Sequence, residues 1–345
     1  MTFTSDATPL DVDAAVVLQH SVRMTQSRHE VDMVAIVHPG VVTGRPALER
    51  LGFRIMEFEP PIRASEGQHL RETIDQSGCC GALELLELCA WSMTEYDRVL
   101  AMNPDTLVLR NMDEIFERDM PPGAVAYTFD HAMDNMGSRM PPVRTGFLLM
   151  RPSVAVYEHL VEIVRVGDFR PGTGWGGLNI GWCWGGQTVS GLLSYFSALE
   201  PHLGYALPPC QHSAMLMTQD CLATPFASVY SIHYTLCLHP WECRLGAGKP
   251  CAEHLHAWWM VRADLERANH LEPSGRCCRL RDSDVCQRRD YAHVPHERMA
   301  LLPMTPAEPL SPDAYERIKR KSVVVMRDDL PHDGQDRNVP GGPFS

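Results

Sequence analysis

Residues 96–117 read YDRVLAMNPDTLVLRNMDEIFE, and this stretch contains the pattern that decides the fold. Residues 99–102 (VLAM) form a short apolar run, which is typical of a strand covered on both faces in an α/β sheet. Proline has no backbone N–H to donate, so Pro104 marks the end of regular strand pairing. The sequence therefore predicts a buried strand that ends in a polar turn.

The polar residues after this strand have two interpretations. Asn103 and Asp105 stand two apart at the carboxyl end of the strand, where open α/β sheets bind their ligands. Their hard oxygen atoms could hold a divalent metal ion, which would in turn hold a diphosphate. The alternative is a β-turn in which asparagine and aspartate bond to backbone groups.

The remaining elements alternate along the chain. Helical periodicity over residues 13–24, 46–51 and 81–94 alternates with strand patterns over residues 32–38, 54–58 and 99–102. This order predicts a parallel sheet with crossover helices. A second apolar run at 106–109 leads to a helix that begins at residue 111. Further strands are predicted at residues 123–127, 144–150 and 229–233, and a further helix at residues 253–268. Ser153 is predicted to cap a helix over residues 154–166, whose core-facing residues are Val154, Tyr157, Leu160, Val161 and Val164.

Composition limits the classes of function. The chain has 345 residues with 44% apolar residues, enough for one large α/β domain or two small ones. The 43 acidic and 31 basic residues give a net charge of −12, which argues against a nucleic-acid partner. An anionic ligand would need local positive charge from a metal ion or from helix N-termini.

Targeting signals and cysteines indicate different compartments. The sequence has no run of 18 apolar residues, so no membrane span is predicted. Residues 1–10 lack the basic start and apolar core of a signal peptide, which favours the cytoplasm. The 12 cysteines favour the secretory pathway instead, which the chain could enter if its N-terminus is truncated. The C-terminal cysteines Cys277, Cys278 and Cys286 are predicted to be free thiols or to form a local disulfide.

Residues 96–117 resemble the nucleotide-sugar site of the glycosyltransferase family 8 group, the relatives of glycogenin and galactinol synthase. In that group a D-x-D tripeptide is followed by T-L-V-L and then by D-E-L-F; here the chain has NPD, TLVL and DEIF. The resemblance extends over residues 2–262. It implies an α/β fold of the GT-A type, with a Rossmann-like mixed sheet and flanking helices, over residues 1–270. Residues 271–345 are then a cysteine-containing, proline-rich tail, predicted to be partly disordered.

The same resemblance assigns residues that contact the donor nucleotide-sugar. Thr4 falls at the position of the family's nucleotide-contacting threonine. Gly146 matches the glycine of the family's N-S/G-G strand, in which Arg144 or Thr145 stands here for the asparagine. Gln187 matches the glutamine of the G-D-Q loop, inside the stretch 172–191 with eight glycines and three tryptophans. Those indole faces suit sugar rings, or they are packing anchors, and the sequence favours neither.

The metal ligands are also assigned by the resemblance. Residues 228–241 (SVYSIHYTLCLHPW) match the family's H-F-x-x-x-x-K-P-W segment, whose histidine is the third protein ligand of the metal. This implies that Asn103, Asp105 and His233 bind Mn²⁺ or Mg²⁺, for which such a set of nitrogen and oxygen ligands is suited. His239 replaces the lysine that faces the diphosphate.

The implied activity is a metal-dependent retaining hexosyltransferase. It would move a sugar from a UDP-sugar donor to a hydroxyl of a carbohydrate or protein acceptor, without nucleic acid. One alternative is a family 8 fold that has lost turnover and acts as a nucleotide- or carbohydrate-binding or scaffold protein, because Asn103 and His239 carry less charge than the family residues. A third is a metal–thiol protein built on the C-terminal cysteines.

Overall fold

The structure is a computed structural model, and it describes most of the chain up to residue 270. The described residues are 1–3, 9–63, 65–67, 81–130, 142–168, 175, 189–215, 218–235, 239–242 and 249–270. The predicted tail over residues 271–345 lies outside them. Within these residues, no helix is long and apolar enough to cross a membrane.

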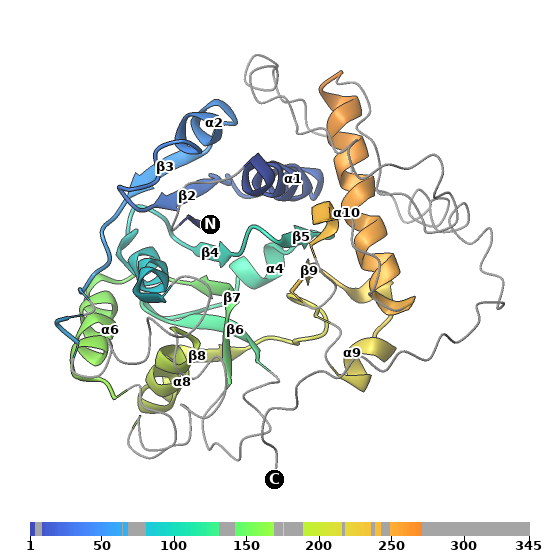
Figure 1. The fold of residues 1–345 in the computed structure, drawn as a ribbon. Coiled ribbons are helices and arrows are strands. Elements are labelled where there is room, and N and C mark those ends of the chain that lie inside the picture. Colours follow the sequence, from blue (N-terminus) through green and yellow to red (C-terminus); the bar gives the residue numbers. More distant parts are fainter. Residues whose placement is uncertain are drawn as a thin grey trace, which may run out of the picture. The chain divides into compact units, whose positions relative to one another are not determined.

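The first elements form a parallel sheet, as the sequence predicts. They are β1 (Thr2–Phe3), α1 (Pro9–Met24), β2 (Val34–Val37), α2 (Arg45–Arg50) and β3 (Arg54–Glu57). Both β1 and β3 pair in parallel with β2, which is the central strand. Each crossover includes a helix, and α2 packs against β3 (Figure 1). The helix and strand assignments over residues 13–58 are confirmed, with α1 starting four residues earlier than expected.

The chain then enters a second sheet, which is mixed. The 3₁₀ helix η2 (Gly81–Ser92) precedes β4 (Val99–Met102), and a sheet of order β4-β7-β6-β8 follows. Its other strands are β6 (Val125–Phe129), β7 (Val143–Met150) and β8 (Gly204–Ala206). Strand β7 is antiparallel to β4 and β6, whereas β8 is parallel to β6. The mixed sheet of the predicted fold class is therefore confirmed.

A short third sheet joins two distant segments. It pairs β5 (Thr106–Val108) with β9 (Ser231–His233) in antiparallel orientation. Helix α4 (Asp113–Phe116) follows β5. The remaining elements are α6 (Val154–Val166), α8 (Val189–Leu199), η5 (Pro201–Leu203), α9 (Gln219–Ala223), η6 (Phe226–Ser228), η7 (Pro240–Glu242) and α10 (Lys249–Ala268).

Several predictions differ from the structure in detail. The strand over 99–102 is only partly buried, with Met102 the single buried residue, because its outer edge borders a cavity of about 930 Å³ between β2 and β4. The expected α-helix over 81–94 is a 3₁₀ helix. Strand β6 and helix α4 each begin two residues late, and α10 begins four residues early.

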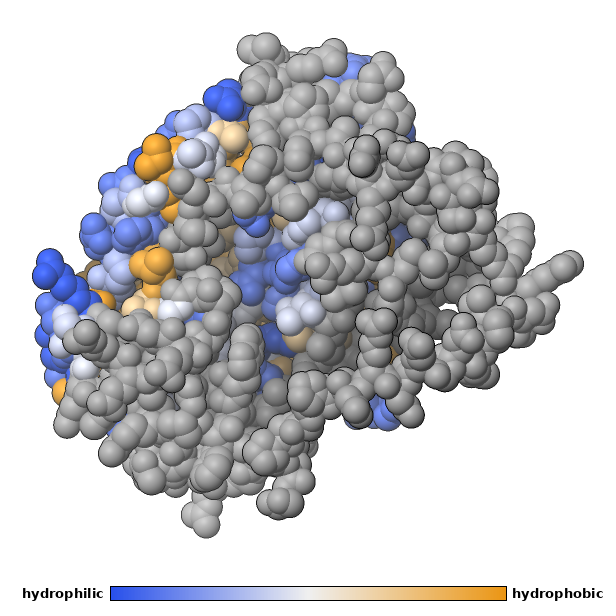
Figure 2. Space-filling view, in the orientation of Figure 1, coloured by the Kyte–Doolittle hydropathy of each residue, from blue (hydrophilic) through white to orange (hydrophobic). Residues whose placement is uncertain are grey.

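Helix α6 shows how the local sequence sets an element. The Ser153 hydroxyl accepts a hydrogen bond from the Val156 N–H, which satisfies a free donor at the helix start. Leu160 and Val164 are buried, as the periodicity predicts. Val154 was expected in the core but is 48% exposed, because it lies in the first turn, at the edge of the packed face. On the face shown in Figure 2, apolar surface occurs in small areas between hydrophilic ones.

Helices α1 and α10 are joined by buried charges. Arg262 of α10 is 1% exposed and donates to Asp13 of α1 at 3.1 Å and to Glu266 at 3.2 Å. His20 and Asp264 also join the two helices, with 3.0 Å between Nε2 and Oδ2. Since breaking a buried ion pair leaves an uncompensated charge, these contacts fix α10 against α1.

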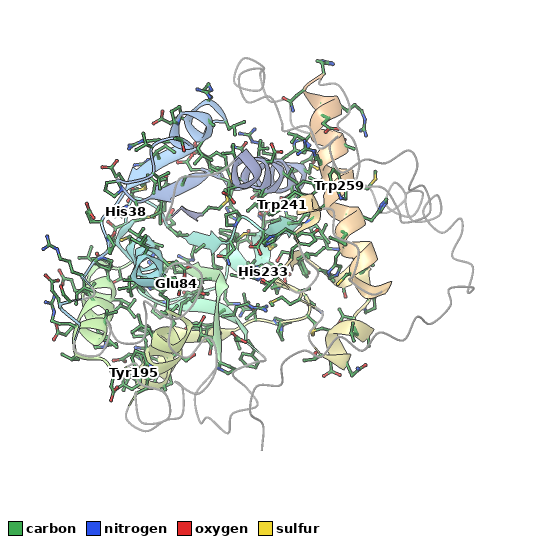
Figure 3. The ribbon with its side chains drawn as sticks, in the orientation of Figure 1. His38, Glu84, Tyr195, His233, Trp241 and Trp259 are labelled. Atoms are coloured by element: carbon green, nitrogen blue, oxygen red, sulfur yellow. A yellow bond between two sulfur atoms is a disulfide. The ribbon has the colours of Figure 1, made fainter. Side chains whose placement is uncertain are left out.

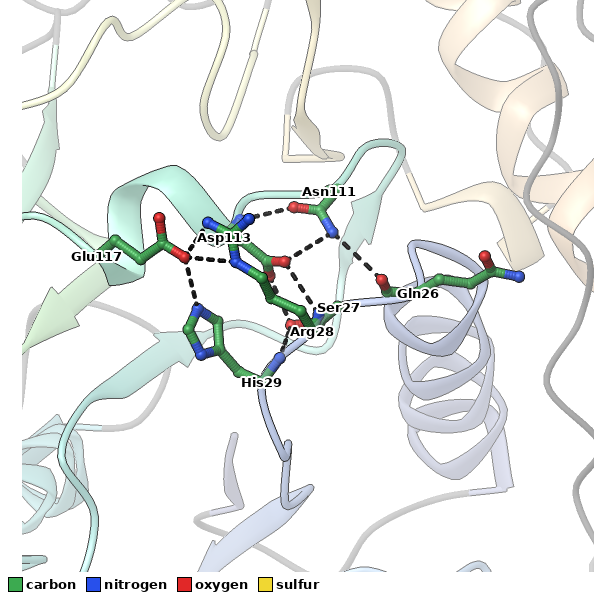
Figure 4. A network of polar contacts seen from close by, with 7 residues as sticks. All are labelled: Gln26, Ser27, Arg28, His29, Asn111, Asp113 and Glu117. Carbon is green, nitrogen blue, oxygen red and sulfur yellow. Dashed lines mark hydrogen bonds and ion pairs between the residues drawn. The ribbon is translucent and has the colours of Figure 1, made fainter.

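A polar network fixes the segment that follows β5 (Figure 4). The Asp113 carboxylate accepts hydrogen bonds from the Ser27 hydroxyl at 2.5 Å, the Arg28 N–H at 3.0 Å and the Asn111 amide at 3.1 Å. Glu117 accepts from the Arg28 guanidinium. These bonds join the loop after α1 to the start of α4, so the end of the NPDTLVL segment is held at a fixed place.

Disulfides also stabilise the described residues. Cys210 and Cys221 are bonded across a sequence separation of 11, and Cys251 is disulfide-bonded as well. Cys89 is a free, buried thiol in η2, and burial raises its pKa to about 11. A thiol with that pKa is almost entirely protonated at neutral pH and therefore unreactive.

Candidate active site

The candidate site forms where β4 ends and β5 pairs with β9. Pro104 interrupts the strand after Met102, and the chain turns before it enters β5 at Thr106. Thr106 lies opposite His233 in the antiparallel register, and the Tyr234 N–H donates to the Asp105 carbonyl at 3.0 Å. This pairing places a histidine from far along the chain beside the polar turn.

The three residues predicted to bind a metal ion lie close together in the structure. The His233 Nε2 lies 3.2 Å from Asp105 Oδ1 and 3.5 Å from Asn103 Nδ2. It also lies 3.0 Å from the Thr235 hydroxyl, a contact that the sequence did not indicate. The His233 side chain is 7% exposed, so its position is set by packing.

This arrangement fits a divalent metal ion. Neighbouring ligands of an octahedral ion lie about 3 Å apart, since each stands about 2.1 Å from the metal. The separations of 3.2 and 3.5 Å around the His233 Nε2 are close to that value. A half-turn of the Asn103 amide would exchange its nitrogen for the oxygen that a metal requires. Among the described residues no group of three histidine, cysteine or acidic residues could hold a metal, so the set depends on that amide.

Gly146 of β7 lies directly against the His233 ring. A Cβ at this position would lie 2.7 Å from Cε1 and 3.1 Å from Nδ1 of His233, and 3.3 Å from Asn103 Nδ2. Only a residue without a side chain lets β7 approach the histidine so closely. The structure thus brings Gly146 close to His233 and Asn103, while its predicted contact with the donor stays a prediction.

His239 lies at the open side of the same carboxylate. Its Nε2 is 3.5 Å from Asp105 Oδ2, and its side chain is 40% exposed. Its ring stacks on Trp241, with 4.8 Å between the ring centroids and 8° between the planes. The ring of Trp241 in turn packs near that of Trp258 of α10, with 5.7 Å between the ring centroids. Figure 3 shows His233 and Trp241 on the same side of the fold, toward α10.

The electrostatics favour an ionised Asp105. Burial would raise the pKa of this carboxyl, but His233 and His239 outweigh burial and hold the pKa well below its usual value. The carboxylate is therefore charged at all pH values at which the protein is expected to work, as a metal ligand must be.

The other predicted site residues are not all described. Thr4 and Gln187 lie outside the described residues, so their predicted contacts with the donor stay predictions. In the glycine-rich stretch 172–191, Trp175 is buried and its ring lies 5.1 Å from that of Tyr195, so this tryptophan is a packing anchor. Sequence reasoning missed the Thr235 hydroxyl and the stacking of Trp241, although both flank residues that it selected.

Comparison with known proteins finds curated relatives that match parts of the chain. No family model matches it. Glycogenin-1 of Oryctolagus cuniculus is 30% identical over 79 residues, or 23% of this chain and 21% of that protein. The proposed glucuronosyltransferase PGSIP8 of Arabidopsis thaliana is 27% identical over 195 residues, or 56% of this chain and 33% of that protein. Glucose N-acetyltransferase 1 of Gibberella zeae is 29% identical over 106 residues, or 31% of this chain and 22% of that protein.

These relatives are of the glycosyltransferase family 8 type, which confirms the resemblance carried by residues 96–117. The chain spans at most a third of the length of these relatives. Among solved structures, the galactosyltransferase LgtC in complex with donor and acceptor sugar analogs is 13% identical with a TM-score of 0.46, covering 75% of this chain and 95% of that chain. Mouse xyloside xylosyltransferase 1 is 15% identical with a TM-score of 0.43, covering 68% and 95%. Both TM-scores are below 0.5, so the α/β fold class rests on the strands and helices described above and not on these two structures.

Proposed function

We propose that this chain is a metal-dependent retaining glycosyltransferase that moves a hexose from a UDP-sugar to a hydroxyl of a carbohydrate or protein acceptor. The observation that carries the proposal is the convergence of Asn103, Asp105 and His233 within 3.2–3.5 Å at the strand ends. The similarity to family 8 transferases supports the reaction class.

In this reaction the bond between the anomeric carbon and the phosphate oxygen breaks, and UDP leaves with that electron pair. A new bond forms between the anomeric carbon and the acceptor oxygen, whose proton is released. When bound at Asn103, Asp105 and His233, Mn²⁺ or Mg²⁺ would neutralise the diphosphate and so make it a better leaving group.

The chain's own residues prepare this site. Asp105 supplies a permanent negative charge for the ion, and its carboxylate is oriented by His233 on one oxygen and His239 on the other. Gly146 leaves the space that His233 occupies. Because these groups are fixed by strand pairing and burial, they need little rearrangement when the donor binds.

The proposal is tested by calorimetry of UDP binding with Mn²⁺ and with EDTA. We expect binding that depends on the metal, and Asp105→Ala to weaken it at least about tenfold, or 1.4 kcal/mol. Asp119→Ala, which removes an exposed carboxylate, is the control and is expected to bind like the wild type. Absence of UDP binding in both media would contradict the proposal.

Turnover separates the transferase from a binding protein. Asn103 is a neutral ligand, so a chain that binds UDP without catalysis is the competing outcome. Release of UDP from a panel of UDP-sugars, measured with and without Mn²⁺, decides between them. Metal-dependent UDP release that Asp105→Ala abolishes supports the transferase, whereas tight binding without release favours a nucleotide-binding or scaffold role.

The disulfides bear on the compartment. Cys210, Cys221 and Cys251 are bonded, which proteins of reducing compartments rarely show. We therefore propose that the chain folds in an oxidising compartment, rather than in the cytoplasm that its N-terminal residues favour. Mass spectrometry of peptides from the natively produced protein tests this: an unbonded Cys210–Cys221 pair would contradict it.

A further inference from the structure

Arg144 is a buried cation at the edge of the candidate site. Its side chain on β7 is 6% exposed, and its Nη1 donates a hydrogen bond to the Ser213 carbonyl at 3.1 Å. Burial lowers the pKa of Arg144 to about 10, while the negative charges of Asp130 and Asp105 oppose that shift. The guanidinium therefore remains charged at neutral pH. A buried charge is costly unless opposite charge compensates it, and the carboxylates of Asp130 and Asp105 favour the charged form of Arg144.

The neighbouring strands place Arg144 beside the proposed metal ligands. Gly146, two residues further along β7, lies against the His233 ring. Ser213, which accepts the hydrogen bond from Arg144, precedes Ala214, and the Ala214 carbonyl accepts from the His233 N–H at 3.1 Å. Arg144 is thus connected to the surroundings of His233 both through its own strand and through its guanidinium.

The acceptor of the Arg144 hydrogen bond is held in an unusual conformation. Ser213 has a φ of 53°, in the left-handed region that non-glycine residues seldom adopt, and it is fully buried. Its N–H donates to the Ser231 hydroxyl at 2.8 Å, which helps to hold it there. Strained residues persist where the surroundings fix them, and they are concentrated at binding sites. The surroundings therefore hold the Ser213 carbonyl, and with it the Arg144 guanidinium, in a defined position.

The charge of the site also calls for a permanent cation. A nucleoside diphosphate carries two to three negative charges, and Asp105 adds another, whereas a divalent ion brings only two positive charges. The amide of Asn103 is neutral, so it adds no charge to the site. A guanidinium is always charged, and its planar fork matches two phosphate oxygens at once.

Building on the function proposed above, we infer that Arg144 binds the diphosphate of the donor, so that the chain distinguishes a nucleoside diphosphate from the uncharged nucleoside. A purely structural arginine would hold the Ser213 segment in place and would influence every ligand of the site alike. An arginine that binds the diphosphate affects only ligands that carry phosphate.

The test compares the affinities of UDP and uridine, measured by ligand-observed NMR with Mn²⁺ present. We expect Arg144→Gln to weaken UDP at least tenfold and to change uridine less than twofold, and Arg144→Lys to recover part of the UDP affinity. Arg151→Gln is the matched control, because Arg151 follows the same strand and also donates to a backbone carbonyl, that of Met120 at 2.9 Å. The control is expected to leave both affinities unchanged.

Three results would overturn the inference. Equal losses of UDP and uridine in Arg144→Gln would make the residue structural, and an unchanged UDP affinity would exclude it from the site. If Arg144→Gln fails to fold, Arg144→Lys still tests the idea, because it keeps the charge and removes the planar fork: it is expected to lower the ratio of UDP affinity to uridine affinity, and a ratio equal to that of the wild type would refute the inference. UDP binding that is absent in the wild type under all conditions refutes the proposed function itself, and is thereby distinguished from the other outcomes.

Discussion

Replacing Gly146 by alanine tests whether close packing of β7 positions His233. The new Cβ would stand 2.7 Å from His233 Cε1, whereas ordinary contacts begin near 3.4 Å, so the ring has to move by about 0.7 Å. The ring has little freedom to do so, because its side chain is 7% exposed and its Nε2 contacts Asp105 and Thr235. A displacement of this size would lengthen the 3.2 Å contact to Asp105 beyond hydrogen-bonding distance.

The expected cost has two parts. Overpacking at this buried position should lower the free energy of unfolding by about 1–3 kcal/mol. The displaced imidazole should weaken metal-dependent UDP binding at least about tenfold, which is 1.4 kcal/mol. Denaturant unfolding measures the first part, and calorimetry with Mn²⁺ measures the second.

Gly204→Ala is the matched control on strand β8. Its Cβ would meet Ser197 and Tyr127 at 3.5 Å, an ordinary contact, so stability and UDP affinity should change by less than about 0.5 kcal/mol. If Gly146→Ala binds UDP and Mn²⁺ like the wild type, His233 is not a ligand held by this packing. If both alanine variants lose the same affinity, the effect is not specific to the site.

Three further predictions concern stability. Removing the disulfide by Cys210→Ala with Cys221→Ala should lower the free energy of unfolding by about 3 kcal/mol, as expected for a closed loop of about this length. If reductant leaves the unfolding midpoint of the wild type unchanged, the result speaks against the bond. Arg262→Met leaves two buried carboxylates without this guanidinium and should cost about 3–5 kcal/mol, whereas Arg267→Met, at an exposed pair, should cost less than about 1 kcal/mol in the same urea titration. Burial and the negative charge of Glu84 raise the pKa of Glu87 from 4.5 to about 8, so the folded state retains a proton that the unfolded state loses. The stabilising contribution of that proton is complete below pH 4.5 and is lost as the pH rises toward 8, at no more than about 1.4 kcal/mol per pH unit; a Glu87→Gln variant with the same pH profile as the wild type would refute this.

The sequence determined the elements and the polar turn of this protein. Apolar runs, Pro104 and the cap residue Ser153 act within a few residues of themselves, so the strand at 99–102 and the helix at 154–166 follow from local sequence. The pattern also selected Asn103 and Asp105, because hard oxygen ligands after a strand are a local feature. The error at Val154 has the same origin: periodicity assigns a face to a helix, but not the edge of its contact with the rest of the protein.

Tertiary structure alone decided which residues meet. The antiparallel register of β5 and β9 puts Thr106 opposite His233, and this pairing spans well over a hundred residues, so no local pattern contains it. The tight fit of Gly146 against His233 depends on the spacing of separate strands. For the same reason, the burial of Arg144, its bond to Ser213 and its place near Asp105 emerge only from the folded chain. Sequence supplied the chemical groups, and long-range strand pairing brought them within contact distance.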